Sequence, residues 1–269
     1  MSFVHLHLHT EYSLIDGLIK IDQLSVKAAG MAMPAIAVTE QGNLFSTVKF
    51  YRAMQNQGVK PLIGAELKIV NHNPEYAFNI VLLCQHIDGY QNLSRLITKS
   101  YTEGQNRGNP LVQIDWLKKY NDGLIIIDCA ENGGFANSIL FQDESKIQKN
   151  IENWLSIFPD RYYFELQRIG KKGQNNYINQ AIKYSEKFNV PVVATNNARF
   201  LEEDDFDAHE ARVCIHQGYT LNDPRRPRQY TPQQYIRTIE EMQELFSDIP
   251  EALDNSVKIA QRCNIEFTL

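Results

Sequence analysis

The chain has 269 residues, of which 43% are hydrophobic, and its 32 acidic and 27 basic side chains give a formal net charge of −5. This composition predicts a folded globular protein with a large core, and it argues against a chain that binds nucleic acid through bulk positive charge. The four cysteines form no C-x-x-C pair, which argues against a zinc ribbon and a secreted disulfide framework. Without a secretory leader pattern or an apolar run of 18 residues, we expect a soluble cytoplasmic protein that contacts no membrane.

The chain opens with three histidines at alternate positions, His5, His7 and His9, in an otherwise apolar segment. A β-strand over residues 3–8 would place all three imidazoles on one face. Imidazole is the commonest side-chain ligand for transition metals, so the pattern predicts a metal site. The alternative is a strand whose histidines are satisfied by hydrogen bonds to the backbone.

Seven strand-like runs follow one another along the chain, with helix-like segments between most of them. The predicted strands cover residues 3–8, 35–39, 61–69, 78–84, 124–128, 162–167 and 191–195. The predicted helices among them cover residues 21–29, 44–57, 90–101, 147–157 and 176–188. Strands that alternate with helices are typical of a largely parallel sheet. The third and fourth strands are joined by residues 71–74, which are typical of a turn and suit a hairpin.

The leading architecture is a distorted α/β barrel of seven strands, one fewer than in the standard barrel. An open doubly wound sheet is the second candidate, although no glycine-rich phosphate motif follows the first strand. After residue 200 only helices are expected, over residues 204–216, 239–246 and 251–263. We therefore predict a barrel over residues 1–200 and a helical extension over residues 201–269. The last residues, 265–269, look like the start of another strand, as in a domain of a longer protein.

Functional groups of such a barrel lie at the C-terminal ends of its strands and in the loops that follow. Several of these positions belong to segments that resemble the polymerase and histidinol phosphatase (PHP) family. The resemblance covers the whole chain and rests on residues 4–17, 39–50, 60–66, 89–96, 193–200 and 207–215. It is strongest to the PHP domain at the N-terminus of bacterial replicative DNA polymerases. It implies a (β/α)7 barrel of the PHP type, followed by a short helical extension.

Active members of this family hold two or three divalent ions, and the resemblance implies where the ligands lie. Retained ligand types are His7, His9, Asp16, Glu66 and Cys129. Other residues stand at the remaining ligand positions: Glu40, Gln41, Asn79, Ile169, Asn197 and Arg199. An amide is a weak ligand, isoleucine has no donor atom, and a guanidinium is always charged. We therefore expect no bound metal, or at most one ion at His7, His9, Asp16 and Glu66.

Asp16 and Glu66 would need a compensating charge if they shared a pocket without metal ions. Arg199 stands at a ligand position of the same pocket. We predict that its guanidinium forms an ion pair with Glu66 or Asp16. The alternative is that Arg199 is a solvated loop residue.

A rigid basic loop over residues 222–228 contains Arg225, Arg226 and Arg228. Positive side chains interleaved with aromatic ones can follow a nucleic acid backbone. The prolines of the loop equally suit a contact with the rest of a polymerase, and a solvated loop is the third alternative. Two further histidines are expected to be structural: His209 beside a carboxylate on its helix, and His5 in the lower barrel interior.

The resemblance implies a place in DNA replication, as part of a DNA-directed DNA polymerase (a nucleotidyltransferase). This domain is expected to be non-catalytic, to stabilise the polymerase body of the same chain, and to dock the proofreading exonuclease subunit beside other replicase subunits. It should need no cofactor. Magnesium for the polymerase reaction and most DNA contacts would belong to the missing part. The main alternative is an active metal-dependent phosphoesterase or 3′–5′ exonuclease of the same family. An amidohydrolase-type barrel is disfavoured because the later histidines are missing.

Overall fold

The computed structural model describes residues 2–71, 73–140 and 143–268. One curled sheet holds the main strands in the order β1-β2-β3-β7-β8-β9, and the short β6 pairs with β2. The strands are β1 (Ala35–Gln41), β2 (Lys60–Val70), β3 (Phe78–Cys84), β6 (Val112–Gln113), β7 (Leu124–Asp128), β8 (Tyr162–Gln167) and β9 (Val192–Thr195). Only β3 runs antiparallel to its neighbours, which confirms the hairpin between the third and fourth predicted strands. His72 of the predicted turn lies outside the described residues.

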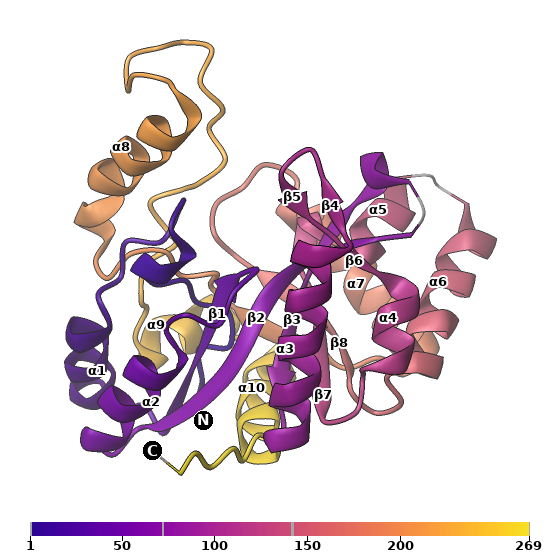
Figure 1. Ribbon diagram of the computed structural model, residues 1–269, viewed down its shortest axis with the longest axis horizontal. Helices are drawn as coiled ribbons and strands as arrows, with labels where there is room; N and C mark the ends of the chain where they lie inside the picture. Colours follow the sequence, from indigo (N-terminus) through magenta and orange to yellow (C-terminus); the bar gives the residue numbers. More distant parts are fainter. Residues whose placement is uncertain (1, 72, 141–142, 269) are drawn as a thin grey trace.

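The helices surround this sheet (Figure 1). They are α1 (Ile21–Gly30), α2 (Thr47–Asn56), α3 (Ile87–Thr102), α4 (Ile114–Lys119), α5 (Gly134–Leu140), α6 (Glu144–Ile157), α7 (Gln174–Phe188), α8 (Phe206–Gln217), α9 (Ile239–Leu245) and α10 (Pro250–Arg262). Short 3-10 turns are η1 (Glu11–Ser13), η2 (Pro74–Tyr76), η3 (Ala130–Asn132) and η4 (Glu203–Asp205), and a small hairpin pairs β4 (Gln105–Asn106) with β5 (Asn109–Pro110). All the predicted helices are present with small shifts at their ends, whereas α4 and α5 were not predicted.

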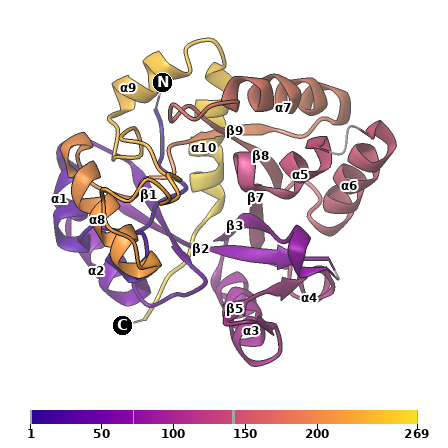
Figure 2. The same cartoon turned by 90° about the horizontal axis from the view of Figure 1, so that it is seen from above.

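The opening segment closes the sheet into a distorted barrel. Its carbonyls accept hydrogen bonds from the amides of Ala37 and Thr39 in β1, at 2.8 and 2.9 Å. On its other side it exchanges two hydrogen bonds with Ala198, just after β9, at 2.9 and 3.1 Å. These hydrogen bonds are too few for a regular strand, so the prediction of a β-strand over residues 3–8 is wrong. The segment nevertheless takes the seventh place in the ring of strands (Figure 2).

The core has two layers because successive strand residues face opposite sides of the sheet. Leu62, Val81 and Ile125 belong to a cluster inside the barrel, whereas residues one position along each strand pack outward against the helices. The inner cluster also includes Ile259 of α10. Lys60, at the start of β2, donates a hydrogen bond to the carbonyl of Ala260 in the same helix. Helix α10 therefore closes the end of the barrel at which the parallel strands begin.

The last described residues do not form the strand that was predicted over residues 265–269. Instead, the ring of Phe267 packs edge-on against Tyr51 and Tyr90, with centroid distances of 5.0 and 5.1 Å. Aromatic contacts with α2 and α3 therefore replace the expected sheet edge, and Leu269 lies outside the described residues. Among the described helices, none has the length and apolar character needed to cross a bilayer.

Candidate metal site

In the opening segment, the neighbouring side chains of Leu6 and His7 both point into the barrel. Leu6 belongs to the inner core cluster. His7 also points into the barrel, where its ring nitrogens reach the carboxylates of Glu66 and Glu165. A regular strand would send these two neighbours to opposite faces. The irregular backbone therefore brings His7 to the interior, at the open end of the barrel.

His5 lies on the other side of this segment. Its ring packs against Phe3 at 4.8 Å, and its Nε2 lies 2.9 Å from the carbonyl oxygen of Arg237. Phe3 belongs to the outer core cluster. The prediction that all three imidazoles share one face is therefore wrong, and so is the prediction that His5 fills the lower barrel interior. The backbone that would have enforced both is not a regular strand.

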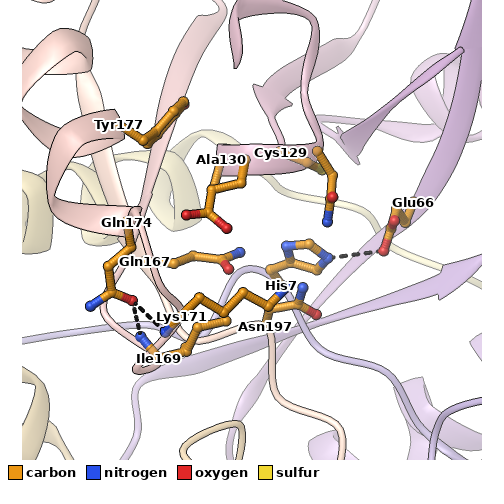
Figure 3. Close-up of a pocket in the computed structure, with 12 residues that line it drawn as sticks. His7, Glu66, Cys129, Ala130, Gln167, Ile169, Lys171, Gln174, Tyr177 and Asn197 are labelled. Carbon is orange, nitrogen blue, oxygen red and sulfur yellow. Dashed lines mark hydrogen bonds and ion pairs between the residues drawn. The ribbon is translucent and has the colours of Figure 1, made fainter. Parts of the chain in front are cut away.

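Glu66 of β2 is the centre of the buried polar cluster. Its Oε2 lies 3.1 Å from His7 Nε2, 2.9 Å from His9 Nε2 and 3.4 Å from Arg199 Nη2. Its other oxygen accepts a hydrogen bond from the amide of Asn79. Burial would raise the pKa of this carboxyl, but the two histidines outweigh burial and hold the pKa well below its usual value. Glu66 is therefore charged, and Figure 3 shows its contact with His7.

Arg199 lies across the mouth of the cluster and is buried. Its Nη1 donates to Asp16 Oδ2 at 2.6 Å, and its Nε donates to Asn197 Oδ1 at 2.9 Å. The hydroxyl of Tyr230 donates to the same Asp16 oxygen, also at 2.6 Å. Burial would raise the pKa of Asp16, but Arg199 outweighs it and lowers that pKa. Together with the 3.4 Å contact to Glu66, these distances confirm the predicted ion pair.

His7 is held between two carboxylates. Its Nδ1 lies 2.7 Å from Glu165 Oε1, and its Nε2 faces Glu66. Burial alone would lower its pKa, but Glu165 and Glu66 outweigh burial and raise the pKa to about 9. Burial and Arg199 lower the pKa of His9 to about 4. At neutral pH His7 is therefore an imidazolium, and His9 is neutral.

Glu40 occupies a substituted ligand position but faces the loop after the opening segment. It accepts hydrogen bonds from the hydroxyls of Thr10 and Ser13. The Ser13 hydroxyl also lies 2.8 Å from His9 Nδ1. Burial raises the pKa of Glu40 despite these hydrogen bonds. Glu40 thus supports the cluster through Ser13 and does not join it directly.

The remaining predicted positions divide between the cluster and its surroundings. The Cys129 thiol lies with His7 and Glu165 in a group whose candidate ligand atoms are within 4.8 Å of one another. Burial raises the pKa of that thiol well above its usual value, so it is protonated. Ile169 is buried and supplies no donor, whereas the side chain of Gln41 is exposed.

Two residues of the cluster, Glu165 and Tyr230, were not predicted from the sequence. Glu165 could have been predicted, because it is a lone carboxylate at an inward position of the apolar strand β8. Tyr230 contacts Asp16 across a separation of 214 residues, and no local pattern indicates that contact. His209 was expected to be structural. Its Nε2 lies 2.8 Å from the carbonyl oxygen of Asp16, which fits that role.

The basic loop lies outside the cluster. Arg225 forms an ion pair with Asp223 at 2.8 Å, and Arg226 forms one with Glu210 of α8. Arg228 is exposed and has no ion pair within the described part of the chain. Two of the three predicted contact residues are thus matched locally, and only Arg228 offers an unmatched charge.

These residues do not fit a cluster of two or three metal ions. The guanidinium of Arg199 binds Asp16 and Glu66, two carboxylates that such ions would need. Both ring nitrogens of His7 face carboxylates, and its proton would have to leave before a metal could bind. A smaller set, His7, His9 and Glu66, still has its ligand atoms within 4.8 Å of one another. Among the described residues, His7, Cys129 and Glu165 form a second set of this kind, but its thiol is protonated. The permanent cation Arg199 lies beside the first set.

Comparisons with known proteins agree with this architecture. A family model described as "PHP domain" matches residues 5–169. DNA polymerase III subunit alpha of Pseudomonas aeruginosa is 44% identical over 270 residues, which cover 100% of this chain and 23% of that protein. The same subunit of Escherichia coli K12 is 44% identical over 268 residues, with 99% and 23% covered. The chain thus spans about a quarter of the length of the curated relatives it matches.

Two solved structures share the fold at low identity. A candidate metal-dependent phosphoesterase from Bifidobacterium adolescentis has a TM-score of 0.51 at 8% identity, over 73% of this chain and 87% of that one. An amidohydrolase from Chromobacterium violaceum, with bound sulfate and no metal, has a TM-score of 0.50 at 11% identity, over 78% of this chain and 97% of that one. At these identities the likeness extends to the fold alone.

Proposed function

The chain belongs to the PHP domain family, and we propose that it serves as a non-catalytic PHP domain within a DNA polymerase III alpha subunit. The supporting similarity is 44% identity to that subunit along the whole of this chain. The full-length protein would carry out DNA-directed DNA synthesis in the cytoplasm, with magnesium bound outside this chain. The division at residue 200 into a barrel and a helical extension is part of the same proposal.

The observation that carries the non-catalytic role is the position of Arg199. Polynuclear hydrolysis uses ions about 4 Å apart that activate a water and stabilise the phosphoryl oxygens. Here a guanidinium lies 2.6 Å from Asp16 and 3.4 Å from Glu66, so one side chain pairs with two carboxylates that a metal cluster would need. A permanent cation at that place also repels divalent ions.

Without catalysis, the role that we propose for this domain is structural. The ion pairs of Arg199 and the hydrogen bond of Tyr230 tie together the loop after the first segment, β2, the residues after β9 and the segment before α9. We propose that this rigid barrel stabilises the polymerase body and docks the proofreading exonuclease subunit, next to other replicase subunits. Arg228 is the residue of the basic loop with a charge available for the polymerase body or for DNA.

A metal-dependent phosphoesterase or 3′–5′ exonuclease is the second candidate. It is favoured by the convergence of His7, His9 and Glu66, whose ligand atoms lie within 4.8 Å of one another. Two histidines and a carboxylate are a common protein ligand set for a single zinc ion. This candidate requires that the proton on His7 be displaced, and that an ion be stable beside Arg199.

The deciding experiment is the metal content of the purified protein. The chain is exposed to zinc and manganese, desalted and analysed by elemental mass spectrometry. We expect far less than one ion per chain. A variant with Asn197→Asp and Arg199→His is the matched control, because it restores two ligand types, and it should retain more metal. One or more tightly held ions in the unaltered chain would overturn the proposal, and hydrolysis of a phosphodiester by that form would establish the second candidate.

A further inference from the structure

One Asn-Gly pair, Asn132-Gly133, lies at the junction of η3 and α5. In such a pair the backbone nitrogen of the glycine can approach the side-chain carbonyl carbon of the asparagine, because glycine has no Cβ to obstruct that approach. Every other asparagine of the chain is followed by a residue that carries a side chain. This pair is therefore the position at which the sequence most favours loss of a side-chain amide.

Asn132 lies at the open end of the barrel and is exposed. It lines an open polar cavity of about 420 Å³ together with Asp16 and Arg199. It also lines a smaller cavity with Cys129 and Lys171, which Figure 3 shows. Within the described part of the chain, no hydrogen bond or ion pair fixes its side-chain amide. Water therefore reaches this amide, and the side chain is free to turn toward its own backbone.

The backbone nitrogen of Gly133 is held weakly. It donates to the carbonyl of Ala130 at 3.3 Å, which is longer than the usual range for such a bond. The nitrogen of Asn132, by comparison, donates to the carbonyl of Cys129 at 2.8 Å. The turn is also strained, because Ala130 has a φ of 29°, where an alanine is rarely found. The nitrogen that would react is thus held by a long hydrogen bond in a strained turn, and a local opening that releases it costs little free energy.

From these features we propose that Asn132 is a site of spontaneous deamidation. The backbone nitrogen of Gly133 forms a bond to Cγ of Asn132 and gives up its proton, and the side-chain nitrogen leaves as ammonia. The product is a five-membered succinimide ring. One water molecule then adds to either ring carbonyl and breaks its bond to the ring nitrogen, which leaves aspartate or isoaspartate at position 132. The reaction consumes one water, releases one ammonia and needs no oxidant or reductant.

The two products differ in their effect on the fold. Aspartate keeps the main chain unchanged and adds a negative charge at the mouth of the cavity, whereas isoaspartate lengthens the main chain by one carbon atom. The packing around Gly133 leaves no room for that atom, because a Cβ there would lie 1.8 Å from Asp128 Oδ1. The other oxygen of Asp128 accepts a hydrogen bond from the nitrogen of Phe135 at 3.0 Å, in the first turn of α5. Isoaspartate should therefore displace Gly133 and loosen the start of α5.

The test incubates the full-length protein that contains this chain at physiological temperature and mildly alkaline pH, and follows each asparagine by peptide mass spectrometry. Asn222 is the internal control, because it is exposed and is followed by Asp223 in place of a glycine. Deamidation at Asn132 should be faster by about tenfold or more, a ratio that corresponds to roughly 1.4 kcal/mol of activation free energy. Asn132→Gln is the matched variant. It would need a larger six-membered ring, so its peptide should stay unmodified over the same time.

A parallel incubation in urea separates the fold from the sequence. If Asn132 deamidated in the unfolded protein and stayed intact in the folded protein, the fold would protect the pair and the proposal would fail. Equal rates at Asn132 and Asn222 in the folded protein would also overturn it.

The effect on the fold is tested on the products. An isoaspartyl-specific methyltransferase labels isoaspartate and leaves aspartate unlabelled, so it identifies the fraction with the longer main chain. That fraction should unfold at a lower urea concentration than Asn132→Asp, which has the charge of the product and a normal main chain. Equal urea midpoints for the two would overturn the predicted loosening of α5.

Discussion

At the scale of single residues, two cations of different kinds pair with the carboxylates of the buried cluster. Arg199 carries a permanent charge, whereas His7 carries a charge only while its proton stays bound. Both face Glu66, and each has a further carboxylate of its own, Asp16 for Arg199 and Glu165 for His7. Because all these groups are buried, removing either cation leaves an uncompensated charge in a low-dielectric interior.

Replacing Arg199 by glutamine should destabilise the fold strongly. Loss of one partner of a buried ion pair costs about 3–5 kcal/mol of unfolding free energy. The matched control is Lys118→Gln, which breaks the exposed pair with Asp115 and should cost less than about 1 kcal/mol. Urea denaturation of both variants measures the difference. Equal losses would show that Arg199 does not stabilise the cluster.

The proton on His7 predicts a pH dependence of stability. Its pKa is raised from 6.5 to about 9 in the folded state, so the folded state binds this proton more tightly. The stabilisation is complete below pH 6.5 and is lost as the pH rises through about 9. Relative to His7→Gln, the unaltered chain should lose stability on the order of 3 kcal/mol over this window. If the unfolding free energies of the unaltered chain and of His7→Gln changed equally with pH, the predicted role of the His7 proton would be contradicted.

At the scale of elements, α3 can approach the loop before β7 only because position 89 has no side chain. A Cβ on Gly89 would lie 2.0 Å from the carbonyl oxygen of Gly123, whereas one on Gly30, at the end of α1, would meet nothing within 4 Å. Gly89→Ala should cost about 1–3 kcal/mol through the clash. Gly30→Ala should be neutral or stabilise by up to about 1 kcal/mol. Thermal unfolding of the two variants compares them, and similar midpoints would argue against a tight approach at Gly89.

Elements that depend on the pattern of neighbouring residues were predicted correctly from the sequence. Features that depend on contacts between distant segments were not. The largely apolar runs of β2 and β8 and the periodicity of α3 and α7 are properties of a few neighbouring residues. The opening segment also alternates, but its backbone bonds are set by Ala37 and Ala198. Its face changes at Leu6, and the orientation of His5 could not be foreseen.

The candidate site divides in the same way. The convergence of His7, His9 and Glu66 followed from the family resemblance. The pairing of Arg199 could be predicted because buried carboxylates in one pocket need a compensating charge. The exposed position of Gln41 and the contact of Tyr230 with Asp16 depend on how loops from both ends of the chain fold back. Sequence patterns carry no information on that geometry.

At the scale of the whole molecule, α10 closes one end of the barrel, and the buried charged cluster lies at the other, open end. Because Arg199 and His7 provide the positive charges that face these carboxylates, the stability of the fold should not depend on a divalent metal ion. A ligand that binds only the folded state, at 100 times its dissociation constant, would stabilise by about 2.7 kcal/mol. We expect the urea midpoint of the unaltered chain to be the same in EDTA and in added zinc.

The variant with Asn197→Asp and Arg199→His provides the contrast for this prediction. It removes the guanidinium that pairs with Asp16 and Glu66, and it adds two ligand types to His7 and His9. It should be less stable than the unaltered chain in EDTA and should recover stability with zinc, because the metal then replaces the lost cation. If the unaltered chain itself gained stability with zinc and lost it in EDTA, a metal ion would be part of the fold. The balance of charge by Arg199 and His7 would then be incomplete, and the non-catalytic role would fail with it.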